Sequence, residues 1–389
     1  MSPRRAFVYV QHLLGIGHLK RAAALCRALA AQGLEVTLAS GGFAVPEIDL
    51  TGIRLVQLPA AGAADTGFKT LVDAGGQVLD DAWRERRSEA LLSAWRDADP
   101  HVLVLELFPF GRRQMRFELM PLVHAANSRQ PRAPIVCSVR DVLGGGQKDP
   151  QRQDEMLELV ERYIDHVLVH GDPEVIGFER TFRHAGRIAG RIEYTGYIVD
   201  PAPAQGRDAG KGEVVVSAGG GAVGAGLLET ALRARPLCTL KNRSWRLLAG
   251  INLGNADFAS LGRLTRETGE GRVALERSRP DFTTLLANCS VSVSQAGYNT
   301  LMEIVQARAR AVVVPFAAGH EIEQTLRARR FAERGLIQIV EESELAPESL
   351  AAAIERALGA PKPVPGAIAM DGARQSAALI ARWAEDAPR

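Results

Sequence analysis

The sequence from Ser290 to Gly335 decides the fold of this chain. It reads Ser-Val-Ser-Val-Ser-Gln-Ala-Gly-Tyr-Asn-Thr-Leu-Met-Glu-Ile-Val over residues 290–305, Ala-Val-Val-Val-Pro-Phe over 311–316, and Gly-His-Glu-Ile-Glu-Gln-Thr-Leu-Arg-Ala over 319–328. Alternating valines predict a short strand at 291–293, and an apolar run predicts a buried strand at 311–314. A helix should follow each strand. Two helix N-termini should therefore lie at the carboxyl edge of one sheet, where anionic ligands bind in open α/β folds.

The first of these helices is expected to begin just after Gly297, which ends the strand. Asn299 or Thr300 can cap it, and Glu303 follows about one turn later. The second helix should span 323–334, beyond the polar loop that Pro315 opens.

Strands, glycine turns and helices recur on both sides of this stretch. Residues 7–10, 15–32 and 35–39 predict a strand, a helix and a second strand, which is how a parallel α/β sheet begins. Residues 200–212 are rich in proline, glycine and charge and predict a linker, after which a new strand starts. We expect two doubly wound domains, 1–200 and 201–365, and a last helical segment, 366–389, that packs back on the first domain.

The composition is that of a globular protein with a large core. The 389 residues are 46% hydrophobic and 24% charged, and the net charge is +2 at pH 7. Because acidic and basic residues are mixed along the chain, nucleic acid is not an expected partner. Nothing resembles a signal peptide, and no apolar run approaches the roughly 18 residues that span a bilayer. The widely spaced Cys26, Cys137, Cys238 and Cys289 favour reduced core thiols and hence a cytoplasmic location.

Two glycine turns suit the approach of a ligand. Residues 219–226 read Gly-Gly-Gly-Ala-Val-Gly-Ala-Gly, and residues without Cβ let backbone amides come close to a diphosphate. The other turn, Gly15-Ile16-Gly17-His18, follows the first strand. Lys20 stands where a dinucleotide fingerprint has its third glycine, so a dehydrogenase is disfavoured.

One short motif has the spelling of a metal site. Asp97-Ala98-Asp99 reads as Asp-x-Asp, but it ends a predicted helix immediately before Pro100. Since Asp and Pro punctuate helix-to-strand junctions, we interpret it as a turn and expect no metal site.

The sequence from Ser290 to Gly335 resembles that of a known family. Gly-Tyr-Asn-Thr at 297–300 with Glu303, Val-Pro-Phe at 314–316 and Glu-Gln-Thr-Leu-Arg-Ala at 323–328 resemble the donor-sugar motif of glycosyltransferase family 28, the MurG-like enzymes. The likeness is greatest to a little-described branch of predicted bacterial glycosyltransferases. It is dense over 213–345 and thinner before. It implies the GT-B fold, an α/β fold of two facing Rossmann-like domains, each a doubly wound parallel sheet, with an interdomain cleft.

The resemblance also implies a donor site. Glu303 would hold the two ribose hydroxyls of the nucleotide, a role that suits a carboxylate; the alternative is a solvated helix residue. Gln324, with Glu323 and His320, would bind the hexose, and Gly221 replaces a family serine beside the diphosphate. The donor-binding residues implied in this way are Gly17, Ser217, Gly219, Gly220, Gly221, Arg277, Ser278, Gln295, Gly297, Tyr298, Asn299, Thr300, Glu303, His320, Glu323 and Gln324.

Catalysis is expected at the first glycine turn. His18 matches a family histidine that faces the acceptor, and histidine is a base near neutral pH with little tuning. The alternative is a polar loop residue satisfied by backbone. Asp141, at a predicted strand end, is our preferred partner to orient His18, and Glu106 is the other catalytic candidate.

The acceptor is expected beside residues 106–119, where three arginines and three phenylalanines are mixed beyond a strand. This mixture suits an anionic or lipid-linked acceptor and a weak peripheral contact with a membrane; the alternative is an ordinary helix with a basic outer face. The acceptor-binding candidates are Gly15, Arg21, Phe108, Phe110, Arg112 and Arg113.

The function implied by the resemblance is transfer of a hexose, an N-acetylhexosamine or a related sugar, from a nucleotide diphosphate sugar. By family habit the nucleotide is uridine, and transfer inverts the anomeric carbon. The acceptor, a small molecule or a lipid-linked one, is unidentified; no cofactor or metal is expected beyond the nucleotide sugar itself. Two alternatives stay open: a non-hydrolysing sugar-nucleotide 2-epimerase and a catalytically idle sugar-nucleotide-binding subunit.

Overall fold

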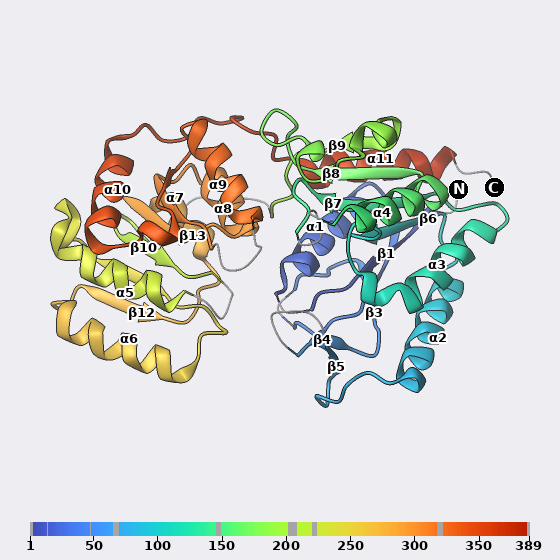
Figure 1. Ribbon diagram of the computed structural model, residues 1–389, viewed down its shortest axis with the longest axis horizontal. Coiled ribbons are helices and arrows are strands. Elements are labelled where there is room, and N and C mark those ends of the chain that lie inside the picture. The colour runs from blue at the N-terminus through green and yellow to red at the C-terminus, as the bar shows by residue number, and fades with distance from the viewer. Residues whose placement is uncertain are drawn as a thin grey trace. The chain divides into compact units, whose positions relative to one another are not determined.

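The computed structural model describes residues 3–13, 15–46, 48–64, 70–144, 149–200, 208–219, 224–316 and 322–386. The chain divides into two compact units, Met1–Val199 with Ile368–Arg389, and Asp200–Ala367. Each unit is an α/β structure built on its own parallel sheet (Figure 1). No helix in the described ranges is both long and apolar enough to cross a membrane.

In the described part of the first unit, a seven-stranded sheet has the order β3-β2-β1-β6-β7-β8-β9, with every neighbouring pair parallel. Its strands are β1 (Arg5–Val10), β2 (Glu35–Ser40), β3 (Ile53–Gln57), β6 (Val102–Glu106), β7 (Ile135–Arg140), β8 (His166–His170) and β9 (Ile192–Tyr194). Its helices are α1 (Gly17–Ala31), α2 (Asp81–Ala98), α3 (Arg116–Ser128), α4 (Pro150–Tyr163) and α11 (Gly372–Asp386).

Both faces of the sheet in the first unit are buried. Successive side chains along a strand point to opposite faces, and on these strands the side chains of both faces are apolar. On β1, Ala6 and Val8 belong to the core shared with α1 and α11, whereas Phe7 and Tyr9 belong to the core shared with α2, α3 and α4. Helix α11, red in Figure 1, thus returns the end of the chain to the first unit.

The second unit repeats the architecture. In its described part the sheet order is β12-β11-β10-β13-β14-β15, again parallel throughout. The strands are β10 (Val214–Ser217), β11 (Trp245–Leu248), β12 (Val273–Glu276), β13 (Val291–Gln295), β14 (Ala311–Val314) and β15 (Gln338–Ile339). The helices are α5 (Ala225–Ala234), α6 (Asn255–Thr268), α7 (Phe282–Asn288), α8 (Tyr298–Gln306), α9 (Glu323–Glu333) and α10 (Pro347–Gly359).

Two local predictions are wrong. The small and polar residues of 62–76 predict a loop. The stretch instead contributes to an antiparallel hairpin of β4 (Ala61–Ala63) and β5 (Leu71–Asp73). Helix α8 begins directly after Gly297, which is its N-cap residue. No side chain forms a capping hydrogen bond with this helix. Asn299 and Thr300 therefore lie inside the first turn rather than at the cap. By contrast, Asp99 ends α2 in the left-handed conformation and bonds Arg5 and Arg129, as expected of a turn.

A buried ion pair holds together the chain at the carboxyl ends of three strands. The guanidinium of Arg87 on α2 donates two hydrogen bonds, of 2.7 and 2.9 Å, to the Glu118 carboxylate on α3. It also donates to Gln11 Oε1, which follows β1, and to the carbonyls of Gly41 and Pro59, which follow β2 and β3. The loops that leave this edge of the sheet are thereby fixed to two helices.

Removing the negative charge of this pair should therefore be costly. Glu118→Gln leaves the Arg87 cation buried without its counter-ion, and the free energy of unfolding should fall by about 3–5 kcal/mol. Glu229→Gln breaks an exposed pair with Arg233 on α5 and should cost at most about 0.5 kcal/mol. Urea denaturation measures the free energy of unfolding of both variants. Equal decreases would show that the buried pair stabilises the fold no more than the exposed pair.

A second polar group inside the first unit is His170 at the end of β8, which is fully buried. Thr195 Oγ1 donates to the Gly196 carbonyl, so His170 Nδ1–H donates to Thr195 at 3.0 Å, and Nε2 accepts from Ser138 Oγ at 2.6 Å. Both ring nitrogens are satisfied in the neutral form. Burial and, less strongly, the charge of Arg21 lower the pKa of His170 to about 3, against the opposing influence of Glu106.

The stability of the first unit should consequently depend on pH through His170. A histidine that is neutral when folded and titrates near 6.5 when unfolded stabilises the fold fully above that value, and this stability is lost as the pH falls toward 3. Between pH 7 and pH 5 its share of the loss is about 2 kcal/mol. Urea denaturation of wild type and His170→Gln across this range should show a pH slope smaller by about one proton in the variant. Identical slopes would mean that the pKa of His170 is the same in the folded and the unfolded protein.

Candidate active site

The sheet of the first unit has a topological switch point between β1 and β6. The chain runs outward from β1 through β2 to β3 and then returns to the other side of β1 with β6. In open parallel sheets, ligands bind outside the carboxyl ends of the two strands at such a point. His18 lies in the first turn of α1, which follows β1, and Glu106 is the last residue of β6. The two residues therefore meet at the place where the topology predicts a site.

His18 and Glu106 are in direct contact. Nδ1 of His18 lies 2.7 Å from Glu106 Oε1, and the Arg21 guanidinium donates to the same oxygen. Since an ionised carboxylate only accepts hydrogen bonds, Nδ1 must carry the hydrogen. The 3.1 Å separation of Arg21 Nη2 from Nδ1 then reflects two donors that converge on one acceptor. This tautomer leaves a lone pair on Nε2 of His18, for which the described residues provide no hydrogen-bond partner.

The electrostatics keep this histidine uncharged. Its side chain is 19% exposed, and that of Glu106 is 2% exposed. Burial lowers the pKa of His18 to about 3, against the influence of Glu106 and with that of Arg112 and Arg140. Burial also disfavours the Glu106 carboxylate, but His18 and Arg21 hold its pKa below the usual range. At neutral pH the site thus contains a neutral imidazole oriented by an ionised carboxylate.

The prediction that Asp141 orients His18 is wrong, since Glu106 lies at that nitrogen. The Asp141 carboxylate instead accepts from the Tyr197 hydroxyl at 3.0 Å and from the Val142 amide at 2.9 Å. Asp141 follows β7, which is two strands from β1, whereas Glu106 ends the adjacent strand. Strand order, which local sequence does not encode, decides between the two carboxylates.

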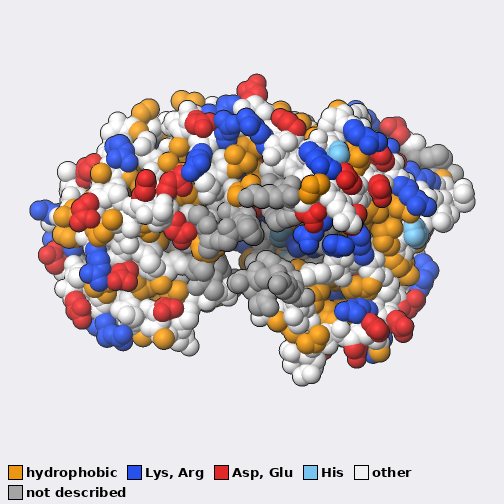
Figure 2. Space-filling view, viewed as in Figure 1, with side chains coloured by type: hydrophobic (Ala, Val, Ile, Leu, Met, Phe, Trp, Pro, Cys, Tyr) orange, Lys and Arg blue, Asp and Glu red, His pale blue; other side chains and the backbone are white. Residues whose placement is uncertain are grey.

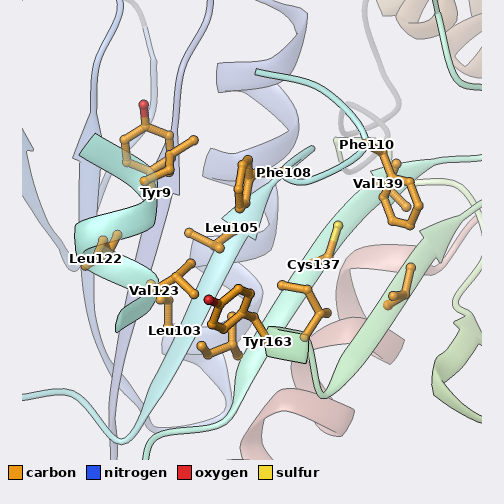
Figure 3. Packing of buried hydrophobic residues seen from close by; sticks show 14 of the residues in the cluster. Tyr9, Leu103, Leu105, Phe108, Phe110, Leu122, Val123, Cys137, Val139 and Tyr163 are labelled. Atoms are coloured by element: carbon orange, nitrogen blue, oxygen red, sulfur yellow. The ribbon is translucent and has the colours of Figure 1, made fainter. Parts of the chain in front are cut away.

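The predicted acceptor surface is largely core. Phe108 and Phe110 are 1% and 3% exposed, and the Phe110 ring packs edge-on against Phe178 and Phe182 with centroids 5.1 Å apart. Figure 3 shows both phenylalanines among Leu105 and other buried residues of the same core. These two rings are unavailable to an acceptor or a membrane, whereas Phe117, the third phenylalanine of the segment, is only partly buried.

The two neighbouring arginines of this segment have different surroundings. Arg113 is 58% exposed and lies 3.8 Å from Glu155 on α4, away from Glu106. The Arg112 side chain is only 10% exposed and turns inward, with Nη2 4.0 Å from Glu106 Oε2. Arg21, predicted to bind the acceptor, holds Glu106, while Gly15 is exposed just before α1. Arg112 is therefore the arginine of the segment that borders the site.

The sheet of the second unit switches direction between β10 and β13. Gly219 follows β10 with φ of +72°, and its amide donates to Ser217 Oγ at 3.2 Å. Gly224 precedes α5 with φ of +141°, and a Cβ there would lie 2.5 Å from that of Ala218. The turn after β10 thus requires glycine at both ends. Gly220 and Gly221 lie outside the described residues, as does His320.

The turn after β13 lies at the same switch point. Gln295 ends the strand and Gly297 caps α8, whose first amides have no side-chain cap. Glu303 is partly buried in the next turn of the helix. The structure therefore brings Ser217, Gly219, Gln295, Gly297, Asn299 and Thr300 to the carboxyl edge of two adjacent strands.

Three other donor candidates have structural roles. Gln324 Oε1 accepts from the Phe316 amide at 3.1 Å and so links α9 to the chain just after β14. Glu323 is buried and pairs at 3.2 Å with Arg327, which lies over the Tyr298 ring. The expectation that the Glu323 carboxylate is open to a hexose is thus wrong, and Tyr298 is 7% exposed in the same cluster.

Arg277 is also engaged within the fold. Its guanidinium donates to the Leu253 carbonyl at 2.8 Å and to Asn255 Oδ1 at 2.6 Å, and it lies over the Phe258 ring. It supports the start of α6, a helix that our sequence analysis did not predict. The donor contact expected at this turn stays a prediction, and the next residue, Ser278, is exposed.

No three His, Cys, Asp or Glu side chains in the described ranges are grouped to hold a metal ion. The four cysteines are free and buried, as the sequence predicts.

Comparison with known proteins identifies the second unit. Residues 216–379 match the model of the glycosyltransferase family 28 C-terminal domain. The relatives include a UDP-N-acetylglucosamine–N-acetylmuramyl-(pentapeptide) pyrophosphoryl-undecaprenol N-acetylglucosamine transferase of Geobacillus thermodenitrificans, 31% identical over 143 residues, which are 36% of this chain and 38% of that protein. The Anaeromyxobacter sp. protein of the same name is 33% identical over 82 residues, 21% of each chain. This chain thus matches at most about two fifths of the length of these relatives.

Solved structures match over the whole chain. Acinetobacter baumannii MurG has a TM-score of 0.59 at 16% identity, with 98% of this chain and 100% of that one covered. The glycosyltransferase of kitacinnamycin has a TM-score of 0.66 at 16% identity, with both chains covered completely. At such identities the likeness shows the fold, which is the predicted GT-B fold. Residues 216–379 are therefore similar to the C-terminal domain of glycosyltransferase family 28.

Proposed function

We propose that this protein transfers an N-acetylhexosamine or a related hexose from a nucleotide diphosphate sugar, carried by uridine, to the hydroxyl of an acceptor. The observation that carries the proposal is the His18–Glu106 pair at the switch point of the first sheet, because it presents a neutral base beside a topological ligand site. The family 28 domain and the names of its relatives, which use a UDP-sugar, support the donor assignment.

In the proposed reaction, the acceptor hydroxyl gives its proton to Nε2 of His18 as its oxygen attacks the anomeric carbon. The bond from that carbon to the diphosphate oxygen breaks on the opposite side, so the configuration inverts and nucleoside diphosphate leaves. Glu106 accepts from Nδ1–H throughout and stabilises the imidazolium that forms. The N-termini of α5 and α8, with the glycine turn after β10, would stabilise the departing diphosphate without a metal.

The direct experiment measures nucleotide release from a panel of nucleotide sugars in the presence of EDTA. It is run with and without hydroxyl acceptors, both small molecules and lipid-linked ones. Release that depends on the acceptor supports the proposal. Interconversion of the sugar with no acceptor present would indicate a 2-epimerase instead, and donor binding without turnover would indicate an idle binding subunit.

Loss of the base should affect the rate and not the donor. His18→Ala should lower kcat by roughly 10²–10⁴, the range of a positioned acid or base, while the donor Kd stays within about twofold. His184→Ala is the control, because that ring contacts Asp154 at the surface. Turnover close to that of wild type in His18→Ala would rule out this histidine as the base.

The donor side is tested at Glu303. Glu303→Gln keeps the shape of the side chain but removes the charge from the proposed contact with the ribose hydroxyls. We expect the Kd of the free nucleotide to rise by roughly 10- to 100-fold, since a hydrogen bond to a charged group contributes about 1.5–3 kcal/mol. Glu333→Gln changes an exposed carboxylate at the end of α9 and serves as the control. Equal nucleotide affinity in the two variants would place the ribose elsewhere.

A further inference from the structure

The region around Glu106 contains more positive than negative charge. Arg112 and Arg140 act electrostatically on His18, and Arg21 and Arg112 act on Glu106. Glu106 is the negative group that acts most strongly on Arg112. The other groups that face Arg112 are Tyr9, His12 and His18, which are neutral at pH 7. The guanidinium groups of Arg21 and Arg112 therefore both lie near the Glu106 carboxylate, one oxygen of which is already used by Arg21 and His18.

Arg112 is the least compensated of the three. Its side chain is nine-tenths buried, yet Nε and Nη2 make no hydrogen bond. The nearest carboxylate oxygen, Glu106 Oε2, is 4.0 Å from Nη2 and also lacks a hydrogen bond. Burying a guanidinium without full pairing costs several kcal/mol, so such an arrangement calls for an added partner.

The backbone of the loop holds Arg112 in this position. Leu107 and Arg112 both have positive φ, of 70° and 61°, which a residue with a Cβ adopts at a cost of roughly 1–2 kcal/mol. The Leu107 carbonyl accepts from the Gly111 amide, and the Arg112 carbonyl accepts from the Met115 amide. The phenylalanines between them are packed into the core, so the loop is fixed and Arg112 is presented in place.

We propose that Arg112, assisted by Arg21 and Arg140, forms an anion subsite beside His18, and that the acceptor carries a phosphate or carboxylate close to the hydroxyl that receives the sugar. The inference rests on the proposed function, because it assigns a chemical class to the acceptor of that reaction. An anion at this place supplies the two missing hydrogen bonds of Arg112 and the missing negative charge. A bridging water would supply only the hydrogen bonds.

The same subsite links recognition to catalysis. The positive charge of Arg112 lowers the pKa of His18. An anion on Arg112 offsets that charge, and the pKa of His18 then rises toward neutrality, which makes the imidazole a stronger base when the acceptor is in place.

The test uses adjacent arginines. Inorganic phosphate, acetate and, at equal ionic strength, chloride are titrated into wild type, Arg112→Met and Arg113→Met by calorimetry. Saturating UDP is present so that the nucleotide site is filled. Binding at the proposed subsite is the part of the anion binding that wild type shows and Arg112→Met lacks. Arg113→Met removes the same charge one residue away, from a side chain that is 58% exposed.

We expect wild type and Arg113→Met to bind phosphate or acetate alike, and Arg112→Met to bind it about 10- to 100-fold more weakly. A preference for phosphate identifies a phosphorylated acceptor, and a preference for acetate identifies a carboxylate. Equal anion affinity in Arg112→Met and wild type would overturn the subsite.

Thermal unfolding provides a second measurement. In chloride, Arg112→Met should be at least as stable as wild type, because it removes an uncompensated buried charge, and phosphate or acetate should then raise the Tm of wild type but not of the variant. A variant that is less stable in chloride, together with a wild type whose Tm no anion raises, would show a purely structural arginine. UDP binding is recorded separately, so failure of the donor assignment is distinguishable from failure of the anion subsite.

Discussion

The chemistry of the first unit depends on the ionised carboxylate of Glu106. It is 2% exposed, and a carboxylate so deeply buried persists only because Arg21 donates to it and His18 does the same. In return it fixes the tautomer of His18, which determines the nitrogen that carries the lone pair. A neutral glutamine at this position could not fix the tautomer of His18, since its amide offers both a donor and an acceptor. The carboxylate thus orients the base more than it changes its charge.

The architecture supplies this carboxylate with its partners. Adjacent parallel strands place β1 and β6 ends side by side, α1 starts within a short turn of β1, and the Arg87–Glu118 pair fixes the neighbouring loops. Two buried polar pairs therefore lie at the carboxyl ends of the strands: the fully buried Arg87–Glu118 pair and the slightly more exposed His18–Glu106 pair. Figure 2 shows Lys, Arg, Asp and Glu interspersed over the viewed surface, so the excess of cations around Glu106 is a local property and not one of the whole chain.

The sequence predicted the fold class because its strands are short apolar runs separated by glycine turns, and each such pattern is local. Ala311–Val314 is a strand at the predicted residues, and Glu323 begins its helix as expected. The errors concern non-local partners. Phe108 and Phe110 look like an aromatic contact surface until Phe178 and Phe182, some 70 residues later, cover them. No feature of the sequence near Asp141 indicates that β6, and not β7, lies beside β1.

An unprotonated histidine is needed for a base, but a low pKa also makes a weak one. Efficient proton transfer needs a pKa near the working pH, and burial with two arginines nearby moves His18 in the opposite direction. The free protein therefore holds its base in a state that resists protonation by water. In the proposed reaction, negative charge delivered by the acceptor would reverse this effect only where an acceptor is bound. Binding energy is then used where it lowers the barrier, because the interaction that positions the acceptor also strengthens the base that activates it.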